Sequence, residues 1–297
     1  MKVLGFLISR NTKLFFKDKG TFFSAMIAPL IMLFLFITFL GNVYRSSLLA
    51  SFPQGVVIDE KIINGFVIGW LISSLLAVCC VTTAFTANMI MVQDKTTGAY
   101  HDLSIAPVKQ SIIGLGYYFS TFIITLIICC LGAAIGFTYL AFVGWYLSIQ
   151  DVLLVFIDIL LIVLFGTAIS SIVCWFLHSQ GGITAVTAIV SAVYGFLCGA
   201  YMPIAQFSKS IRNFICLLPG TYGTSLLRNH MVSGVLSEME ANKIPAEAIK
   251  GIRDGFDINM YFFEKNVQIS HMYIVVVAAV VVLIGVYVLL NVTKKKD

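Results

Sequence analysis

Residues 152–177 read VLLVFIDILLIVLFGTAISSIVCWFL and contain one formal charge, Asp158. An apolar helix needs about 20 residues to cross a bilayer, so this stretch is long enough for a complete crossing. The rest of the chain has a similar character: 59% of its 297 residues are hydrophobic and 11% are charged. Because a soluble domain carries about 25% charged residues, the composition predicts an all-α polytopic membrane protein. It leaves little room for a separate soluble domain, so we expect residues 1–297 to form a single transmembrane domain.

Five further apolar segments flank this stretch, which gives six predicted transmembrane helices. The first is too long for the core of a signal peptide and no small-residue cleavage site follows it, so we expect it to remain in the protein. The domain then divides into an N-terminal segment (1–20), spans one to five (21–202), an outer segment (203–270), and span six with a basic tail (271–297). The predicted spans are Thr21–Val43, one within Ile62–Val92, one within Gln110–Leu147 starting near Tyr117, Val152–Leu177, Gly182–Met202 and Met272–Val292.

Basic residues near the ends of the spans predict the orientation. With a cytoplasmic N-terminus, the short outer loops hold only Arg45 and Lys61, and the positive-inside rule then places both termini in the cytoplasm. The outer segment also carries basic residues, but long segments cross regardless of charge. We expect a multi-pass protein of a bacterial plasma membrane. The ten inner basic residues are Lys2, Arg10, Lys13, Lys17, Lys19, Lys95, Lys109, Lys294, Lys295 and Lys296.

The N-terminal segment has the pattern of an amphipathic helix. Such a helix lies in the membrane interface with its basic face toward lipid phosphates or a partner; the alternative is a simple extension of span one. The net charge of +5 is carried largely by the two ends, which suits anionic lipid better than nucleic acid. At 100° per residue the apolar arc holds Leu4, Leu7, Ile8, Leu14 and Phe15, and the opposite arc holds Lys2, Arg10, Lys13 and Lys17.

Residues 94–110, DKTTGAYHDLSIAPVKQ, separate the second and third predicted spans. His101, Asp102 and Ser104 invite a catalytic interpretation, but adjacent side chains such as His101 and Asp102 usually point in different directions. The chain also lacks G-x-S-x-G, H-E-x-x-H and the nucleotide-binding G-x-x-x-x-G-K-[ST], so we assign no catalytic residue, no metal site and no ATP site. Gly98 permits a tight turn before a short helix, Ala99–Ile105, which Pro107 ends. Such a helix can transmit a push from a soluble partner; an ordinary solvated loop is the alternative.

Two motifs carry a family resemblance. DKTTGAYHDLSIAPVKQSIIGLG resembles the loop between spans two and three of type-2 ATP-binding cassette (ABC) exporter permeases, although Asp94 stands where that family often has Glu. GAYMPIAQFSKSIRNFICLLPGTYGTSLLR, residues 199–228, is similar to the family's second motif after span five. With the six spans and the long outer segment, the resemblance covers nearly the whole chain. The positions matching the second motif are Gly199, Pro203, Pro219, Tyr222, Leu227 and Arg228.

The resemblance implies a membrane subunit that exports a substrate by alternating access, along a path near a dimer axis lined partly by spans two and five. It implies a separate cytoplasmic ABC ATPase that holds ATP and Mg²⁺, with no cofactor in this chain, and assembly as a homodimer or with a similar permease. An intramembrane enzyme and a passive channel or receptor are the alternatives. The residues that the resemblance assigns to coupling with the ATPase are Asp94, Gly98, Tyr100, His101, Asp102, Leu103 and Pro107.

The outer segment is predicted to contain helices that do not cross the membrane, and the resemblance implies that they are re-entrant helices at the outer exit, before span six. Only 15 residues separate Pro203 from Pro219, so this stretch should form an interfacial helix, and a second helix should run from Thr221, its N-cap, to about Val235. The insert 237–265 contains a predicted short helix, with Pro245 near its start and Gly255 at its end, and forms either a solvated lid or one that recognises a substrate or partner. Its equivalent varies widely within the family, so the substrate does not follow from the resemblance.

Asp158 is the only formal charge within a predicted span. A carboxylate in that position costs about 2.5–3.5 kcal/mol on insertion scales, so it must face protein or water. The alternatives are a structural role, a depth close enough to the outer surface to reach water, and a substrate or proton role.

Overall fold

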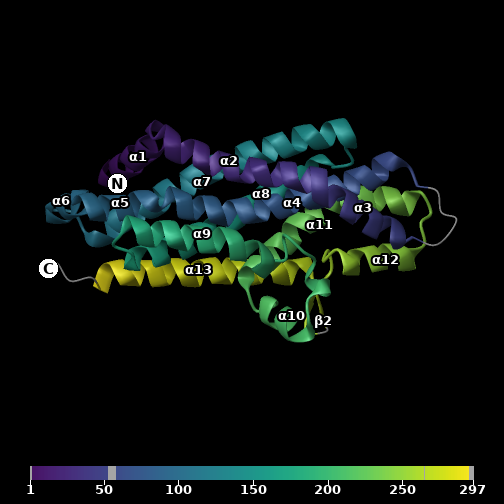
Figure 1. Ribbon diagram of the computed structural model, residues 1–297. Coiled ribbons are helices and arrows are strands. Elements are labelled where there is room, and N and C mark those ends of the chain that lie inside the picture. Colours follow the sequence, from purple (N-terminus) through teal and green to yellow (C-terminus); the bar gives the residue numbers. More distant parts are fainter. Residues whose placement is uncertain (1, 53–57, 264, 294–297) are drawn as a thin grey trace.

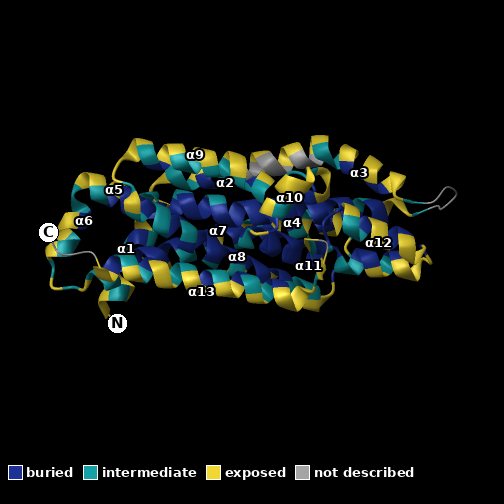
Figure 2. Cartoon of the chain, turned by 90° about the horizontal axis from the view of Figure 1, so that it is seen from below, coloured by how far each residue is buried: buried dark blue, intermediate teal, exposed yellow. Residues whose placement is uncertain are grey.

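Helix α4 (Glu60–Ala87) lies at the centre of the protein and is buried along nearly its whole length. The structure is a computed structural model that describes residues 2–52, 58–263 and 265–293. Figure 2 shows the buried residues concentrated along the middle of the bundle, with exposed residues on the outer helices. The helices packed around α4 are α2 (Lys19–Leu35), α7 (Gln110–Val143), α8 (Ile149–Phe176), α9 (Gln180–Leu197) and α11 (Pro219–Ala241).

Shorter elements connect and extend this bundle. A π-helical turn, η1 (Phe36–Leu40), joins α2 to α3 (Gly41–Ala50), and a 3₁₀ turn, η2 (Ile204–Gln206), precedes α10 (Lys209–Ile215). A two-stranded antiparallel hairpin, β1 (Met260–Phe262) with β2 (Lys265–Val267), pairs Tyr261 with Asn266. The remaining helices are α1 (Lys2–Lys17), α5 (Met89–Thr97), α6 (Ala99–Ile105), α12 (Ala246–Gly255) and α13 (Ile269–Thr293).

Within the described residues, five helices are long and apolar enough to cross a membrane: α4 continued by α5, α7, α8, α9 and α13. They coincide with predicted spans two to six. The first predicted span, Thr21–Val43, coincides with α2, η1 and the start of α3, none of which reaches that length alone, so the count of six remains a prediction. Span three begins at Gln110, earlier than predicted. Span five ends at Leu197 rather than Met202, because Gly199 adopts a positive φ of 71° that terminates the helix.

Local sequence signals explain where two of the long helices begin. The Ser148 hydroxyl accepts a hydrogen bond from the Asp151 backbone N–H, and the Asp151 carboxylate accepts one from the Ser148 N–H, which forms a capping box for α8. Asp59 caps α4 by accepting a hydrogen bond from the backbone N–H of Lys61.

The two ends of the bundle differ. Helices α1 and α6 and the last turn of α13 lie at one end, whereas α3 and α12 lie at the other (Figures 1 and 2). The described ends of the chain thus lie at the same end of the bundle, and their location on the cytoplasmic side of the membrane stays a prediction. The predicted basic tail, Lys294–Lys296, lies outside the described residues.

Helix α1 is a separate helix packed against α7, not an extension of span one. It ends at Lys17, and the Asp18 carboxylate accepts a hydrogen bond from the Thr21 backbone N–H at the start of α2. Leu7 and Phe15 are buried against the bundle. The predicted basic face is partly wrong, since Arg10 points into the protein, toward Asp94, and not toward lipid.

The insert 237–265 is not a lid surrounded only by solvent. Its predicted helix is confirmed as α12, but Ile249 and Ile252 are buried in the main hydrophobic core while Glu247 and Lys250 stay exposed. After α12, the ring of Phe256 packs against Phe66, with 5.1 Å between ring centroids. The Trp70 indole N–H donates a 2.9 Å hydrogen bond to the Phe256 carbonyl. The insert is therefore docked on α4 through its apolar face.

Candidate functional site

The turn between α5 and α6 has the predicted geometry. Gly98 adopts a φ of 85°, a left-handed conformation that disfavours residues with a side chain, and α6 then spans Ala99–Ile105 as predicted. Ala106 is extended, with a ψ of 151°, as expected for a residue before proline, and α6 ends there. The chain thus projects a two-turn helix at the end of the bundle (Figure 1).

The side chains of α6 divide into an outward and an inward set. His101 and Asp102 are exposed, and Ile105 is 68% exposed despite being apolar. Tyr100 is buried and Leu103 is half-buried against the core shared by α1, α5 and α7. The side chains of this segment most accessible to a partner are therefore His101, Asp102, Ile105 and Pro107, and Leu103 is only partly accessible.

The geometry of α6 gives no support to a catalytic group. The Ser104 hydroxyl donates a 2.7 Å hydrogen bond to the backbone carbonyl of His101, not to its imidazole. Among the described residues, no group of three or more His, Cys, Asp or Glu side chains is placed to hold a metal ion.

Asp94 lies directly behind this surface and joins three helices. Its carboxylate accepts two hydrogen bonds from the Arg10 guanidinium on α1, at 2.5 and 3.0 Å, and one from the Tyr117 hydroxyl on α7, at 2.5 Å. The Asp94 carboxylate, chiefly through its hydrogen bonds, raises the pKa of Arg10. A carboxylate that is nearly buried and bonded three times fixes α5 against α1 and α7.

The next residue ties the same turn to α8. The Lys95 ammonium donates hydrogen bonds to the backbone carbonyls of Cys174, Trp175 and Leu177, at 2.9, 2.7 and 3.2 Å. These carbonyls lie at the C-terminal end of α8, where the Cys174 carbonyl also accepts the backbone N–H of the C-cap residue Leu177, and a cation there opposes the negative end of the helix dipole. Three long elements, α1, α7 and α8, are therefore attached to α5 immediately before α6.

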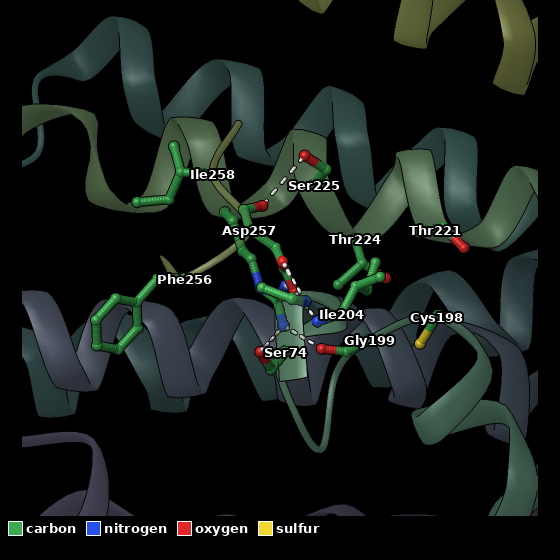
Figure 3. A network of polar contacts seen from close by, with 12 residues as sticks. Ser74, Cys198, Gly199, Ile204, Thr221, Thr224, Ser225, Phe256, Asp257 and Ile258 are labelled. Atoms are coloured by element: carbon green, nitrogen blue, oxygen red, sulfur yellow. Dashed lines mark hydrogen bonds and ion pairs between the residues drawn. The ribbon is translucent and has the colours of Figure 1, made fainter. Parts of the chain in front are cut away.

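At the other end of the bundle, Arg228 forms the centre of a buried polar network. Its side chain is 1% exposed and lies 4.4 Å above the Trp70 ring. The guanidinium donates to the Asp257 carboxylate at 3.4 Å, to the Ser74 hydroxyl at 3.1 Å and to the Gly199 carbonyl at 2.5 Å. Figure 3 shows Ser74, Gly199 and Asp257 converging on this point. The network joins α4, α11, the turn after α9 and the insert.

Asp257 belongs to the insert, for which a solvated lid was one of the two predicted forms, and its side chain is not solvated. The side chain is 8% exposed, and its carboxylate accepts hydrogen bonds from the backbone N–H groups of Ile204 and Ala205 as well as from Arg228. Burial raises the pKa of Asp257 to about 6, an effect that the Arg228 charge opposes. Nothing in the sequence distinguishes Asp257, whose side chain points into the protein, from the other acidic residues of the insert.

The other residues of the second motif are structural parts of the same region. Pro203 precedes η2, and Pro219 occupies the first turn of α11, where its missing N–H carries no cost. The Tyr222 hydroxyl donates to the Cys216 carbonyl at 2.8 Å, and Leu227 is fully buried. Helix α11 starts at Pro219 with Leu218 as N-cap, so the prediction of Thr221 as N-cap is wrong.

Asp158 on α8 has two partners that the sequence did not identify. One carboxylate oxygen lies 2.6 Å from Nδ1 of His230 on α11, and the other accepts a 2.7 Å hydrogen bond from the Tyr273 hydroxyl on α13. The Asp158 side chain is 0% exposed, and both of its oxygens are engaged. This arrangement supports a structural role, in which one intramembrane carboxylate holds three helices together.

The five membrane-length helices of the described residues, with α4 among them, define a multi-pass membrane protein. The sequence profile of ABC-2 family transporter proteins matches residues 46–292, and the chain belongs to this family. It is therefore the permease subunit of an ABC transporter, a transport subunit and not itself an enzyme, and the family implies association with an ABC ATPase subunit. A comparison with curated proteins gives no match.

Proposed function

We propose that the chain exports its substrate by alternating access, and that a separate cytoplasmic ATPase drives it by gripping α6. The observation that carries this proposal is the contrast between α6 and the residues behind it. His101, Asp102 and Ile105 are exposed, while Asp94 and Lys95 are bonded to three other helices. A force applied to α6 would therefore move several helices and not only a loop.

A crevice in the bundle supports the predicted substrate path. It encloses about 100 Å³ between α2, α4 and α9, which correspond to spans one, two and five. Its lining includes the hydroxyl groups of Ser24, Thr82, Thr86 and Ser191 and no charged side chain. We propose that the path between two permease copies opens along this crevice and that its hydroxyl groups replace water around polar parts of the cargo.

The grip on α6 can be tested with one apolar and one titratable residue. Ile105→Asp places a charge where the ATPase would bury an isoleucine, whose transfer is worth about 1.5–3 kcal/mol, or roughly a ten- to hundredfold change in affinity. His101→Gln keeps a polar side chain but removes acid–base chemistry. Leu103→Asp tests the grip less specifically, because Leu103 also packs within the chain's own core and its loss would lower stability as well as binding.

Both variants are reconstituted with the ATPase at matched expression, and ATPase binding and transport are measured. We expect Ile105→Asp to lose at least 90% of both signals with an unchanged melting temperature, and His101→Gln to retain most of both. Normal binding and transport by Ile105→Asp, together with inactive His101→Gln, would refute the grip and reopen the catalytic interpretation.

A further inference from the structure

The outer end of the bundle contains a cavity that no step of the proposed transport cycle uses. It encloses about 450 Å³ between α10, the end of α12 and strand β1. In Figure 1, α10 and β2 lie beside each other and away from the main bundle, near the end of α13 that is opposite to its C-terminus. One face of α10 lines the cavity with Lys209, Arg212, Asn213 and Cys216, at helical spacing.

Charges of opposite sign lie on the walls of this cavity. Arg212 is exposed on the α10 wall, and Asp254 is half-buried on the α12 wall. One oxygen of Asp254, Oδ1, accepts hydrogen bonds from the Asn259 amide at 2.7 Å and the Tyr261 hydroxyl at 2.8 Å. These bonds hold the carboxylate in place, and no described residue donates to its other oxygen, Oδ2.

The second acid of the cavity is already engaged. Asp257 receives the Ile204 and Ala205 backbone N–H groups and the Arg228 guanidinium. The Asp257 carboxylate therefore stabilises the protein itself. Of the two acidic residues described in the cavity, Asp254 is the one available to a ligand. The cavity thus combines cationic groups on one wall with an oriented carboxylate on the other, which suits a zwitterion.

The surroundings indicate that this zwitterion is part of a lipid. On the side of α10 away from the cavity, Ile211 and Phe214 are 47% and 54% exposed, and at the cavity Phe263 is 51% exposed. A helix that is apolar on one face and cationic on the other lies in the plane of a membrane interface. The cavity would then open at the depth of the lipid headgroups, with apolar side chains beside it.

We propose that this cavity binds the phosphoethanolamine headgroup of an outer-leaflet lipid. The Arg212 guanidinium receives the phosphate, Oδ2 of Asp254 accepts a hydrogen bond from the ammonium group, and the acyl chains leave the cavity beside Phe263. A choline headgroup has no N–H to donate, and a glycerol headgroup has no cation for Asp254. Phosphatidylethanolamine should therefore bind more tightly than both phosphatidylglycerol and phosphatidylcholine.

The test measures binding of these three lipids, with identical acyl chains, to the purified full-length chain in detergent. Arg212→Gln should weaken binding of all three lipids, and that of phosphatidylethanolamine at least tenfold, because a charge-assisted contact to the phosphate that they share is lost. Asp254→Asn should weaken only phosphatidylethanolamine, to the level of phosphatidylglycerol. Glu247→Gln and Lys250→Gln, exposed on α12 and outside the cavity, should leave all three affinities unchanged and serve as matched charge controls.

Three results would overturn the proposal. Equal affinity of the three lipids would exclude a headgroup site, and an unchanged affinity in Arg212→Gln would exclude this cavity. Competition by free glycerophosphoethanolamine at the same concentration as the intact lipid would show that the cavity takes a soluble zwitterion. If Asp254→Asn lowers the melting temperature, the Arg212→Gln measurement decides, because the hydrogen bonds of the described residues that hold β1 in place involve Asp254, Asn259, Tyr261 and Cys216 and not the exposed Arg212 side chain.

Discussion

Replacing Arg228 by methionine should strongly destabilise the end of the bundle that holds α12. Methionine has a similar length and is apolar, so the substitution removes the cation without opening a large cavity. Three partners lose their donor: the Asp257 carboxylate, the Ser74 hydroxyl and the Gly199 carbonyl. The Trp70 ring also loses the cation that lies 4.4 Å above it.

The size of the effect follows from the burial of the pair. Breaking a buried ion pair by removing one partner costs about 3–5 kcal/mol, because the remaining charge is left uncompensated. For a domain of this size that cost corresponds to a fall in melting temperature of about 6–20 °C. The penalty should depend on pH. Burial raises the pKa of Asp257 from 3.8 to about 6. The protonated carboxyl therefore contributes fully to the stability of the folded state below about pH 4, and this stability is lost as the pH rises through 6.

Without Arg228 the pKa of Asp257 should rise further, since the opposing positive charge is gone. The defect of Arg228→Met should therefore be larger at pH 8 than at pH 5. The assay is thermal unfolding in detergent at both values, for Arg228→Met, Asp257→Asn and the double variant. The double variant should be more stable at pH 8 than Arg228→Met alone, because no unpaired charge remains. Strict additivity of the two single effects, or a defect that does not depend on pH, would refute the buried-pair explanation.

Three further outcomes are expected. Arg10→Gln should lower the free energy of unfolding by about 2–3 kcal/mol, because it leaves the nearly buried Asp94 carboxylate without its cation. Adding Asp94→Asn to the same chain should recover part of this loss. Equal defects in the single and double variants would contradict the pairing. Single cysteines at Ser104 and Ser237, in a background without native cysteines, should be labelled from opposite sides of the membrane, and labelling of both by an impermeant reagent on intact cells would refute the six-span topology. The purified chain should hydrolyse no ATP alone and should support hydrolysis only with its ATPase, so sustained activity of the chain free of contaminants would contradict the division of labour.

The elements predicted correctly from the sequence are those with strong local signals. The long apolar segments exceed the length of a bilayer crossing, and α6 is bounded by Gly98 and Pro107, whose backbone preferences act within one turn. Helix α12 was found by the same kind of signal, a proline near its start and a glycine at its end. The first predicted span is less regular in the structure, because the π-helical turn η1 interrupts the α-helix where the sequence shows only a continuous apolar run.

The polar partners could not be predicted, because they depend on tertiary contacts. Arg10 and Asp94 lie 84 residues apart, and Asp158 and His230 lie 72 residues apart. A single sequence gives the phase of each residue on its own helix but not which helix it faces. One signal was available for Arg10: it lies between Leu7 and Phe15, on a helix whose inward face also carries Asn11. A polar residue on that face indicates a polar partner in the bundle.

The bonds of Asp94 and the network around Arg228 both involve one nearly continuous helix, which would connect the proposed grip on α6 with the opposite end of the bundle. Helix α4 carries Trp70 and Ser74, and α5, which follows it after Asn88, carries Asp94. At 1.5 Å per residue, Ser74 and Asp94 are about 30 Å apart along this helix. A displacement of α6 that moves α5 must either bend the helix at Asn88 or shift Ser74 against Arg228.

If the helix moves as one unit, Arg228→Lys, which keeps the charge but not the planar guanidinium, should reduce ATPase stimulation by the permease while leaving ATPase binding intact. Its effect should not be additive with that of Asp94→Asn, since both variants act on the same moving element. Additive effects would mean that the helix bends at Asn88, so that the two ends of the bundle move independently.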